Sequence, residues 1–151
     1  MKILLVCTGN TCRSPMAAAM LQRLLEQRGA DMGEYQIITA GLGAGTGWPA
    51  SPGAMYAMQL MGLDISQHRS QALNREMVES ADMILTMTAT QRECLADKYP
   101  QHSLKINTLA QAVGEQADIL DPFGQDAVKY VESAREIKRL LEKLVELVVN
   151  K

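Results

Sequence analysis

The segment best suited to chemistry lies at residues 7–15, where the sequence reads CTGNTCRSP. Cys7 and Arg13 bracket a short stretch that contains Gly9 and Asn10. A cysteine thiolate is a strong nucleophile, and the planar guanidinium of an arginine donates two parallel hydrogen bonds to two oxygens of one phosphate. The spacing therefore predicts that Cys7 attacks phosphorus while Arg13 holds the surrounding oxygens.

The sequence on either side predicts the elements that would position these two side chains. Residues 3–6 are uniformly apolar, as in a strand buried on both faces, and Ser14-Pro15 is typical of a helix start with Ser14 as its N-cap. Open α/β sheets bind ligands at such strand-to-helix turns, where free backbone N–H groups and the helix dipole attract anions. Gly9 and Asn10 tolerate the backbone conformations that a tight loop needs, and the Ser14 hydroxyl could donate to the thiolate. The phosphate-binding residues expected from this arrangement are Thr8, Gly9, Asn10, Thr11, Cys12 and Arg13.

Other interpretations of these features are less consistent with the sequence. A Walker A loop ends in Gly-Lys-Ser/Thr, whereas the corresponding residues here are Cys12-Arg13-Ser14. The glycines in residues 41–47 match no register of G-x-G-x-x-G, so we expect a flexible surface loop there rather than a second phosphate site. A buried structural cysteine beside a surface arginine is the remaining alternative for residues 7 and 13, and the flanking strand and helix signals disfavour it.

Phosphoryl transfer also needs a proton donor for the leaving group, and Asp121 is the best candidate. It begins the run Asp121-Pro122-Phe123-Gly124, in which the proline restricts the backbone beside the carboxylate. The stretch 114–128 carries acidic residues and no basic one. The competing interpretation is an Asp-Pro turn that caps the last helix.

Apolar runs and helical patterns alternate along the whole chain. Strands are expected over residues 3–6, 35–40, 82–87 and 104–108. Helices are expected from Ser14-Pro15 to a C-cap at Gly29, and over residues 51–61, 74–80, 89–98 and 126–149. This order predicts a single doubly wound α/β domain over residues 1–151.

Composition limits the class of protein and its partners. The chain has 151 residues, of which 47% are hydrophobic and 21% charged, so it can bury a core and is not disordered. A net charge of −2 argues against nucleic acid as a partner, and no apolar run reaches the length of a membrane span. Three cysteines cannot all pair within one chain, which indicates a reducing, cytoplasmic setting. We expect a monomer, with Cys94 in the core.

The motif at residues 7–15, followed late in the chain by Asp121-Pro122, resembles the low-molecular-weight protein tyrosine phosphatase family. The resemblance extends to residues 39–41, 64–70 and 82–87, and so covers essentially the whole chain. It implies a three-layer α/β fold, with helices on both faces of a four-stranded parallel sheet. It also implies a phosphocysteine intermediate, no metal or other cofactor, phosphorylated proteins as substrates and inorganic phosphate as product.

The same resemblance implies roles for individual residues. It makes Cys7 the nucleophile, Arg13 the clamp on the phosphoryl oxygens and Asp121 the general acid. It implies that Cys12 can form a reversible disulfide with Cys7, although Cys12 could instead simply fill space in the loop. Residues that would support the loop through hydrogen bonds are Asn10, Ser14 and His68. A surface histidine at a helix end is the alternative for His68.

At two positions the sequence resembles that of the protein arginine phosphatases within this family. Thr11 stands where tyrosine-directed members usually carry an aliphatic residue, and Phe123 stands where they often carry tyrosine after the proline. A hydroxyl suits a polar guanidino group, whereas a phosphotyrosine ring prefers apolar walls. The acidic stretch 115–126 would also suit a cationic product. We therefore predict a phosphatase for phosphoarginine in proteins, with Thr11 and Phe123 as specificity residues and phosphotyrosine as the alternative substrate.

Two functions outside this prediction stay open at this point. Arsenate reduction would need a relay of resolving thiols, which Cys12 could begin but which Cys94 is poorly placed to continue. A non-enzymatic anion-binding module would bind phosphate without turnover, so an assay with an aryl phosphate would distinguish it from an enzyme.

Overall fold

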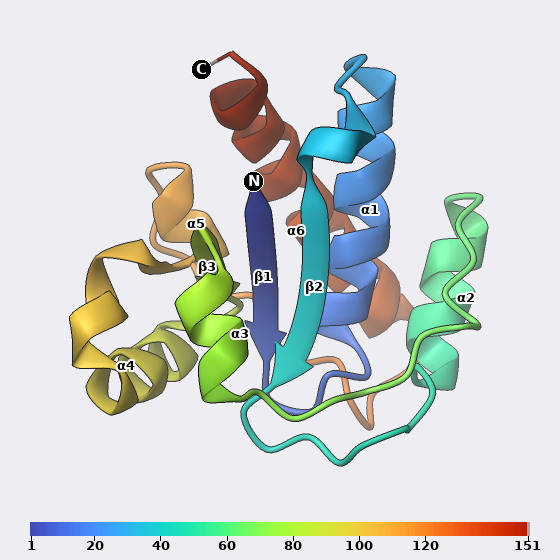
Figure 1. The fold of residues 1–151 in the computed structure, drawn as a ribbon. Coiled ribbons are helices and arrows are strands. Elements are labelled where there is room, and N and C mark those ends of the chain that lie inside the picture. Colours follow the sequence, from blue (N-terminus) through green and yellow to red (C-terminus); the bar gives the residue numbers. More distant parts are fainter. Residues whose placement is uncertain (151) are drawn as a thin grey trace.

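The computed structural model describes residues 1–150, and a parallel sheet lies at its centre (Figure 1). Its four strands are β1 (Lys2–Cys7), β2 (Gln36–Gly41), β3 (Met83–Thr86) and β4 (Ile106–Thr108). They pair in the order β2-β1-β3-β4, and every pair is parallel. Because the chain leaves β1 toward one edge and later returns to its other side, the carboxyl end of β1 is the switch point at which such sheets bind ligands.

Helices cover both faces of this sheet (Figure 1). One face packs against α1 (Arg13–Gln27), α2 (Pro52–Leu60), α5 (Leu109–Ala112) and α6 (Ala127–Val149). The other face packs against α3 (Arg75–Ser80) and α4 (Ala89–Lys98). Short 3₁₀ helices, η1 (Met32–Glu34) and η2 (Pro100–Lys105), precede β2 and β4. The predicted three-layer α/β fold is therefore confirmed.

The alternation of side chains along β1 determines the face of the sheet on which the predicted nucleophile, Cys7, lies. Ile3, Leu5 and Cys7 belong to the core between the sheet and α1, whereas Leu4 and Val6 belong to the core on the opposite face. Cys7 is the last residue of the strand, and α1 begins a few residues later. Its thiol is consequently directed toward the start of α1, where helix N–H groups have no intrahelical partner.

The start of α1 differs from the prediction. Ser14 is not the N-cap, because the helix begins at Arg13 and Cys12 occupies the cap position without a side-chain hydrogen bond. Pro15 still lies in the first turn, where a missing N–H costs no intrahelical bond. Since no side chain caps this helix start, its amides are left for a ligand.

The other predicted boundaries agree with the structure to within a few residues. α4 begins and ends as expected, and Gly29, at φ +73°, follows the end of α1. The prediction for Cys94 was wrong, because it is exposed on α4 while the adjacent Leu95 faces the core. Consecutive helix positions point about 100° apart, so an apolar neighbour does not imply burial. Within residues 1–150, no helix combines the length and the apolar character needed to cross a membrane.

Candidate active site

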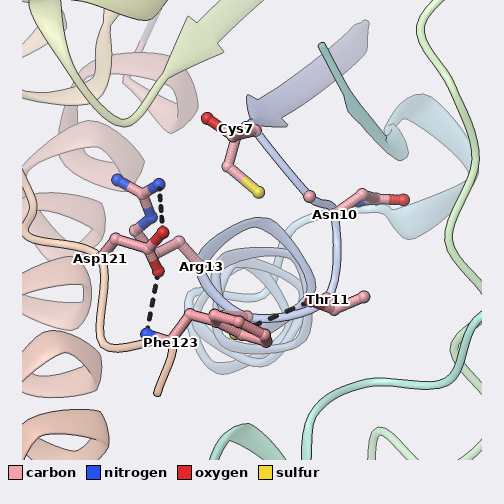
Figure 2. A pocket seen from close by; sticks show the side chains of 9 residues that line it. Cys7, Asn10, Thr11, Arg13, Asp121 and Phe123 are labelled. Atoms are coloured by element: carbon pink, nitrogen blue, oxygen red, sulfur yellow. Dashed lines mark hydrogen bonds and ion pairs between the residues drawn. The ribbon is translucent and has the colours of Figure 1, made fainter. Parts of the chain in front are cut away.

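A pocket of about 270 Å³ opens where β1 ends and α1 begins. Figure 2 shows the Cys7 sulfur directed into it, with Arg13 and Asp121 on one side and Asn10 and Thr11 on the other. The loop between β1 and α1 and a segment just before α6 together supply its lining residues, which are Cys7, Thr8, Gly9, Asn10, Thr11, Cys12, Arg13, Asp121 and Phe123. The structure thus brings the predicted nucleophile, clamp, acid and specificity residues into one pocket.

The Cys7 sulfur lies within hydrogen-bonding distance of a hydroxyl group. Its Sγ lies 3.0 Å from the Ser14 Oγ, and that oxygen accepts a hydrogen bond of 2.8 Å from the Asn10 Nδ2. Because the Asn10 amide already supplies one hydrogen to the Ser14 oxygen, the Ser14 hydroxyl hydrogen is free to point at the sulfur. Both Ser14 and Asn10 are fully buried, so this donor is held in place without competition from water.

Asn10 connects the nucleophile to a second loop. It has a φ of +57°, in the left-handed region that asparagine tolerates better than most residues. Its Oδ1 accepts from the Gln71 backbone N–H at 2.9 Å, which fixes the orientation of the amide. The His68 Nε2 lies 2.6 Å from the Asn10 carbonyl oxygen, and since a carbonyl only accepts, that nitrogen donates. His68 therefore contacts the loop as the family resemblance implied.

Arg13 is held from the opposite side of the pocket. It is 4% exposed, and its Nη1 donates to the backbone carbonyl of Ile119 at 2.9 Å. Its Nη2 lies 3.5 Å from the Asp121 Oδ2. The Ile119 N–H in turn donates to the Met87 carbonyl, just beyond β3, at 3.0 Å. The guanidinium is thus oriented by backbone that the sheet itself anchors.

Asp121 reaches the pocket from an exposed loop. Its side chain is half exposed, and its Oδ1 accepts from the Phe123 N–H at 3.0 Å. The competing interpretation of this residue as a cap for the last helix was wrong, because Asp126 occupies the N-cap of α6 and accepts from the Lys129 N–H. The loop is tied to α6 where the Ser133 hydroxyl donates to the Leu120 carbonyl at 3.2 Å.

The acidic stretch before α6 does not face the pocket as a whole. Of its acidic residues only Asp121 lines the pocket. Glu115 instead accepts hydrogen bonds from Arg139 and Lys143 of α6 at 2.8 and 2.7 Å, and these cations lower the pKa of its carboxyl to about 2. Asp118 accepts from the Ala89 N–H at 2.9 Å. Of the stretch that was expected to suit a cationic product, only Asp121 is therefore placed to meet one.

Cys12 faces a buried polar cluster behind the pocket. Its Sγ lies 3.1 Å from the Ser51 Oγ and 3.7 Å from the Tyr130 hydroxyl. Burial raises the pKa of the Tyr130 hydroxyl. Ser51 occupies the N-cap position of α2, but its side chain makes no capping bond. Cys7, Cys12 and Cys94 are all free thiols in the structure.

The sequence analysis missed residues that support the loop from other segments. The Gln91 side chain, on α4, donates from Nε2 to the Thr8 Oγ1 at 3.0 Å. Gly41 packs so closely that a Cβ there would lie 2.6 Å from the Thr8 carbonyl oxygen. The only sequence signal for Gln91 was a Thr-x-x-Gln capping box over residues 88–91, placed just after the third strand. Among residues 1–150, no three His, Cys, Asp or Glu side chains gather as metal ligands would.

A thiol with a serine donor beneath it, an arginine beside it and a carboxylate at the pocket mouth define the cysteine-dependent phosphatases as a class. Comparison with known proteins identifies the family. The profile of the low molecular weight phosphotyrosine protein phosphatases matches residues 2–151. The chain belongs to this family and is a cysteine-based phosphatase.

Similar proteins include members named for two different substrates. The chain is 38% identical to a probable low molecular weight protein-tyrosine-phosphatase, EpsP, of Ralstonia nicotianae, over 91% of this chain and 88% of that protein. It is 36% identical to the protein-arginine-phosphatase of Bacillus subtilis, over 95% of this chain and 94% of that protein. A solved structure of the YwlE arginine phosphatase, a cysteine-to-serine mutant with a phosphorylated active site serine, superposes with a TM-score of 0.94 at 34% identity. That match covers 100% of this chain and 97% of the other.

Proposed function

We propose that this phosphatase hydrolyses phosphoarginine in proteins. The observation that carries the proposal is Thr11, which lines the pocket as a half-buried side chain opposite Asp121 (Figure 2). Its backbone carbonyl accepts from the Ser51 N–H at 2.9 Å, which fixes the position of the residue in the wall. A hydroxyl at this point can contact a guanidino group, for which an aliphatic side chain would offer no polar partner. The similarity to a protein-arginine-phosphatase supports the same substrate.

The chemistry proceeds in two displacements at phosphorus. In the first, the Cys7 thiolate forms the sulfur–phosphorus bond while the bond to the leaving nitrogen breaks and Asp121 gives that nitrogen a proton. Loop amides and Arg13 hold the three equatorial oxygens as charge spreads over them. In the second, the Asp121 carboxylate takes a proton from water, whose oxygen attacks phosphorus. The thiolate then departs with the hydrogen bond from Ser14.

The test compares phosphate release from phosphoarginine and phosphotyrosine peptides of the same sequence. We expect the wild type to prefer phosphoarginine and Thr11→Ile to shift the ratio of kcat/KM values toward phosphotyrosine by about tenfold or more. Thr11→Ser is the matched control, because it keeps the hydroxyl and should keep the preference. A ratio that Thr11→Ile leaves unchanged would remove Thr11 as the selector.

Phosphotyrosine is the second candidate. Although Phe123 resembles the arginine-directed members in residue type, the exposure of its ring favours phosphotyrosine. This ring lines the pocket and is 67% exposed, so it could stack on the ring of a phosphotyrosine. Phe123→Leu should then weaken phosphotyrosine turnover more than phosphoarginine turnover. Equal effects on the two peptides would leave Phe123 as a general part of the pocket mouth.

Further properties are part of the same proposal. We propose that residues 1–151 act as one phosphatase domain, as a monomer in the cytoplasm, on phosphorylated proteins. The family resemblance also supports a protective disulfide between Cys7 and Cys12, which are neighbours in one pocket wall. If so, thiol reductant should restore activity after peroxide treatment of the wild type, and Cys12→Ser should lose that recovery.

A further inference from the structure

The Thr8 hydroxyl, which directly follows the nucleophile in sequence, has a hydrogen that the protein around it does not use. Thr8 lines the pocket. Within residues 1–150, its Oγ1 has one hydrogen-bond partner, the Gln91 Nε2 at 3.0 Å. If the hydroxyl accepts in that bond, its own hydrogen is left to donate to a ligand; if it donates, it is not.

The surroundings of Gln91 settle this direction. Its Oε1 accepts from two backbone amides, the Met87 N–H at 3.0 Å and the Thr88 N–H at 3.1 Å. That oxygen is therefore the acceptor end of the amide, and Nε2 is the donor end that faces Thr8. Since Thr8 receives a hydrogen bond from Gln91, its own hydroxyl hydrogen remains available for an acceptor.

Thr8 is exposed, but one contact restrains its hydroxyl and others restrain its backbone. Gln91 is buried and takes part in the capping box of α4, so its amide is fixed by the backbone. On the other side, the Thr8 carbonyl accepts from the Gly43 N–H at 3.0 Å, and Gly41 leaves no room for a side chain against it. A donor whose position is set before the substrate arrives needs no rearrangement during the reaction.

We propose that the Thr8 hydroxyl donates this hydrogen to a phosphoryl oxygen, as a side-chain donor beside the backbone amides and Arg13, with Gln91 as the residue that orients it. The proposal rests on the proposed phosphatase reaction at this pocket. The acceptors that a phosphatase pocket holds next to the nucleophile are the oxygens of the phosphoryl group. Thr8 then contacts the reacting group, and Gln91 is a positioning residue that acts through it.

The first experiment removes the hydroxyl and measures competitive inhibition by inorganic phosphate. Thr8→Val should raise the inhibition constant about tenfold or more, because hydrogen bonds to charged groups contribute more than neutral ones. kcat/KM for an aryl phosphate should fall by a similar factor. Thr8→Ser keeps the hydroxyl and should recover most of both losses that Thr8→Val shows.

The second experiment reverses the polarity of the orienting side chain. In Gln91→Glu, one carboxylate oxygen can still accept from the Met87 and Thr88 amides, but the other can only accept, so the Thr8 hydrogen would turn away from the pocket. We expect Gln91→Glu to weaken phosphate inhibition about as much as Thr8→Val does. Gln111→Glu is the matched control, because Gln111 occupies the same place in the capping box of α5 and its substitution introduces the same charge.

The double variant Thr8→Val/Gln91→Glu separates orientation from charge. If Gln91 acts through Thr8, the double variant should be little weaker than either single variant; if the new charge alone repels phosphate, the two losses should add. The proposal is overturned by such additivity, by an unchanged inhibition constant in Thr8→Val, or by equal losses in Thr8→Ser and Thr8→Val. A wild-type protein that neither binds phosphate nor hydrolyses an aryl phosphate would instead overturn the proposed function itself.

Discussion

Two loops form the walls of the active-site pocket and are built in different ways. The first, residues 7–14, is the buried wall, and the second, the loop before α6, is the exposed wall. Most of the loop of residues 7–14 is buried, although Thr8 and Gly9 are exposed. Its Asn10, Arg13 and Ser14 are buried polar residues with hydrogen-bond partners. The facing loop before α6 is open to solvent, and its Leu120 and Phe123 are 80% and 67% exposed. From this second loop, the Asp121 carboxylate and the Phe123 ring line the pocket (Figure 2).

This difference matches what each wall must recognise. A phosphoryl group has the same charge and shape in every substrate, so a rigid set of donors can be aimed at it in advance. The leaving group and the polypeptide around it vary between substrates, and a carboxylate on an exposed loop can reach them. Substitutions of the residues that hold the phosphoryl group should therefore affect all substrates alike. Substitutions at Thr11 and in the second wall should instead depend on the leaving group.

The largest expected effect comes from the nucleophile in the buried wall. Cys7→Ser should lower turnover of every phosphorylated substrate by at least about 10⁴-fold, because a serine hydroxyl has no comparable population of the anionic form. The circular dichroism spectrum and the thermal midpoint should stay close to the wild type, since the replacement changes one atom. A fully active variant would rule out the phosphocysteine mechanism.

The acid in the exposed wall should show the dependence on leaving group. Asp121→Asn removes the proton donor and should slow substrates with poor leaving groups by about 10²- to 10⁴-fold. Aryl phosphates that carry electron-withdrawing groups should lose much less, because their leaving oxygen needs no proton. A series of substituted phenyl phosphates measures this, and equal losses across the series would remove Asp121 as the acid.

The buried wall should also respond in stability, through Asn10. Asn10→Ala leaves the Gln71 N–H without its acceptor and places a Cβ-bearing residue without a polar side chain at φ +57°, so we expect a loss of about 2 kcal/mol or more in the free energy of unfolding. Activity should fall about tenfold on all substrates, because the Ser14 donor is released. Urea denaturation and steady-state kinetics measure the two effects.

Asn10→Gly is the control for this prediction. Glycine adopts a positive φ without strain but cannot make the side-chain hydrogen bonds. It should recover part of the stability and none of the activity. If Asn10→Gly is as active as the wild type, the hydrogen bonds of Asn10 do not support the nucleophile.

The smallest effect is expected at the base of the exposed wall, where Glu115 pairs with Arg139 and Lys143. Its pKa is lowered from 4.5 to about 2, so the unfolded chain binds the proton more readily. The stabilisation is therefore complete above about pH 4.5 and is lost as the pH falls toward about 2. Urea midpoints for the wild type and Glu115→Gln should differ slightly at pH 7 and approach each other as the pH falls from about 4.5 toward about 2. Parallel loss of stability in both proteins would contradict this role.

What the sequence determined by itself was largely local. Residues 7–15 predict the nucleophile, the arginine and the anion-binding turn, because their chemistry depends on a few consecutive residues between a strand and a helix. The α/β class followed from the alternation of apolar runs, which depends only on the periods of strands and helices. Even here the N-cap was misassigned, because the helix begins at Arg13 and Cys12 occupies the cap position without a side-chain hydrogen bond.

Only the tertiary structure decided which distant residues complete the site. Gln91 contacts the loop because α4 follows β3, whose carboxyl end lies beside that of β1. Gln71 contacts it because the adjacent Ala72 pairs with Gly41 at the end of β2. The acidic stretch before α6 looked uniform in sequence, yet the structure separates Asp121 at the pocket from Glu115, which cations of α6 neutralise. The physical reason is that hydrogen bonds and ion pairs act over a few ångströms in space, and which groups come that close depends on the packing of the whole chain.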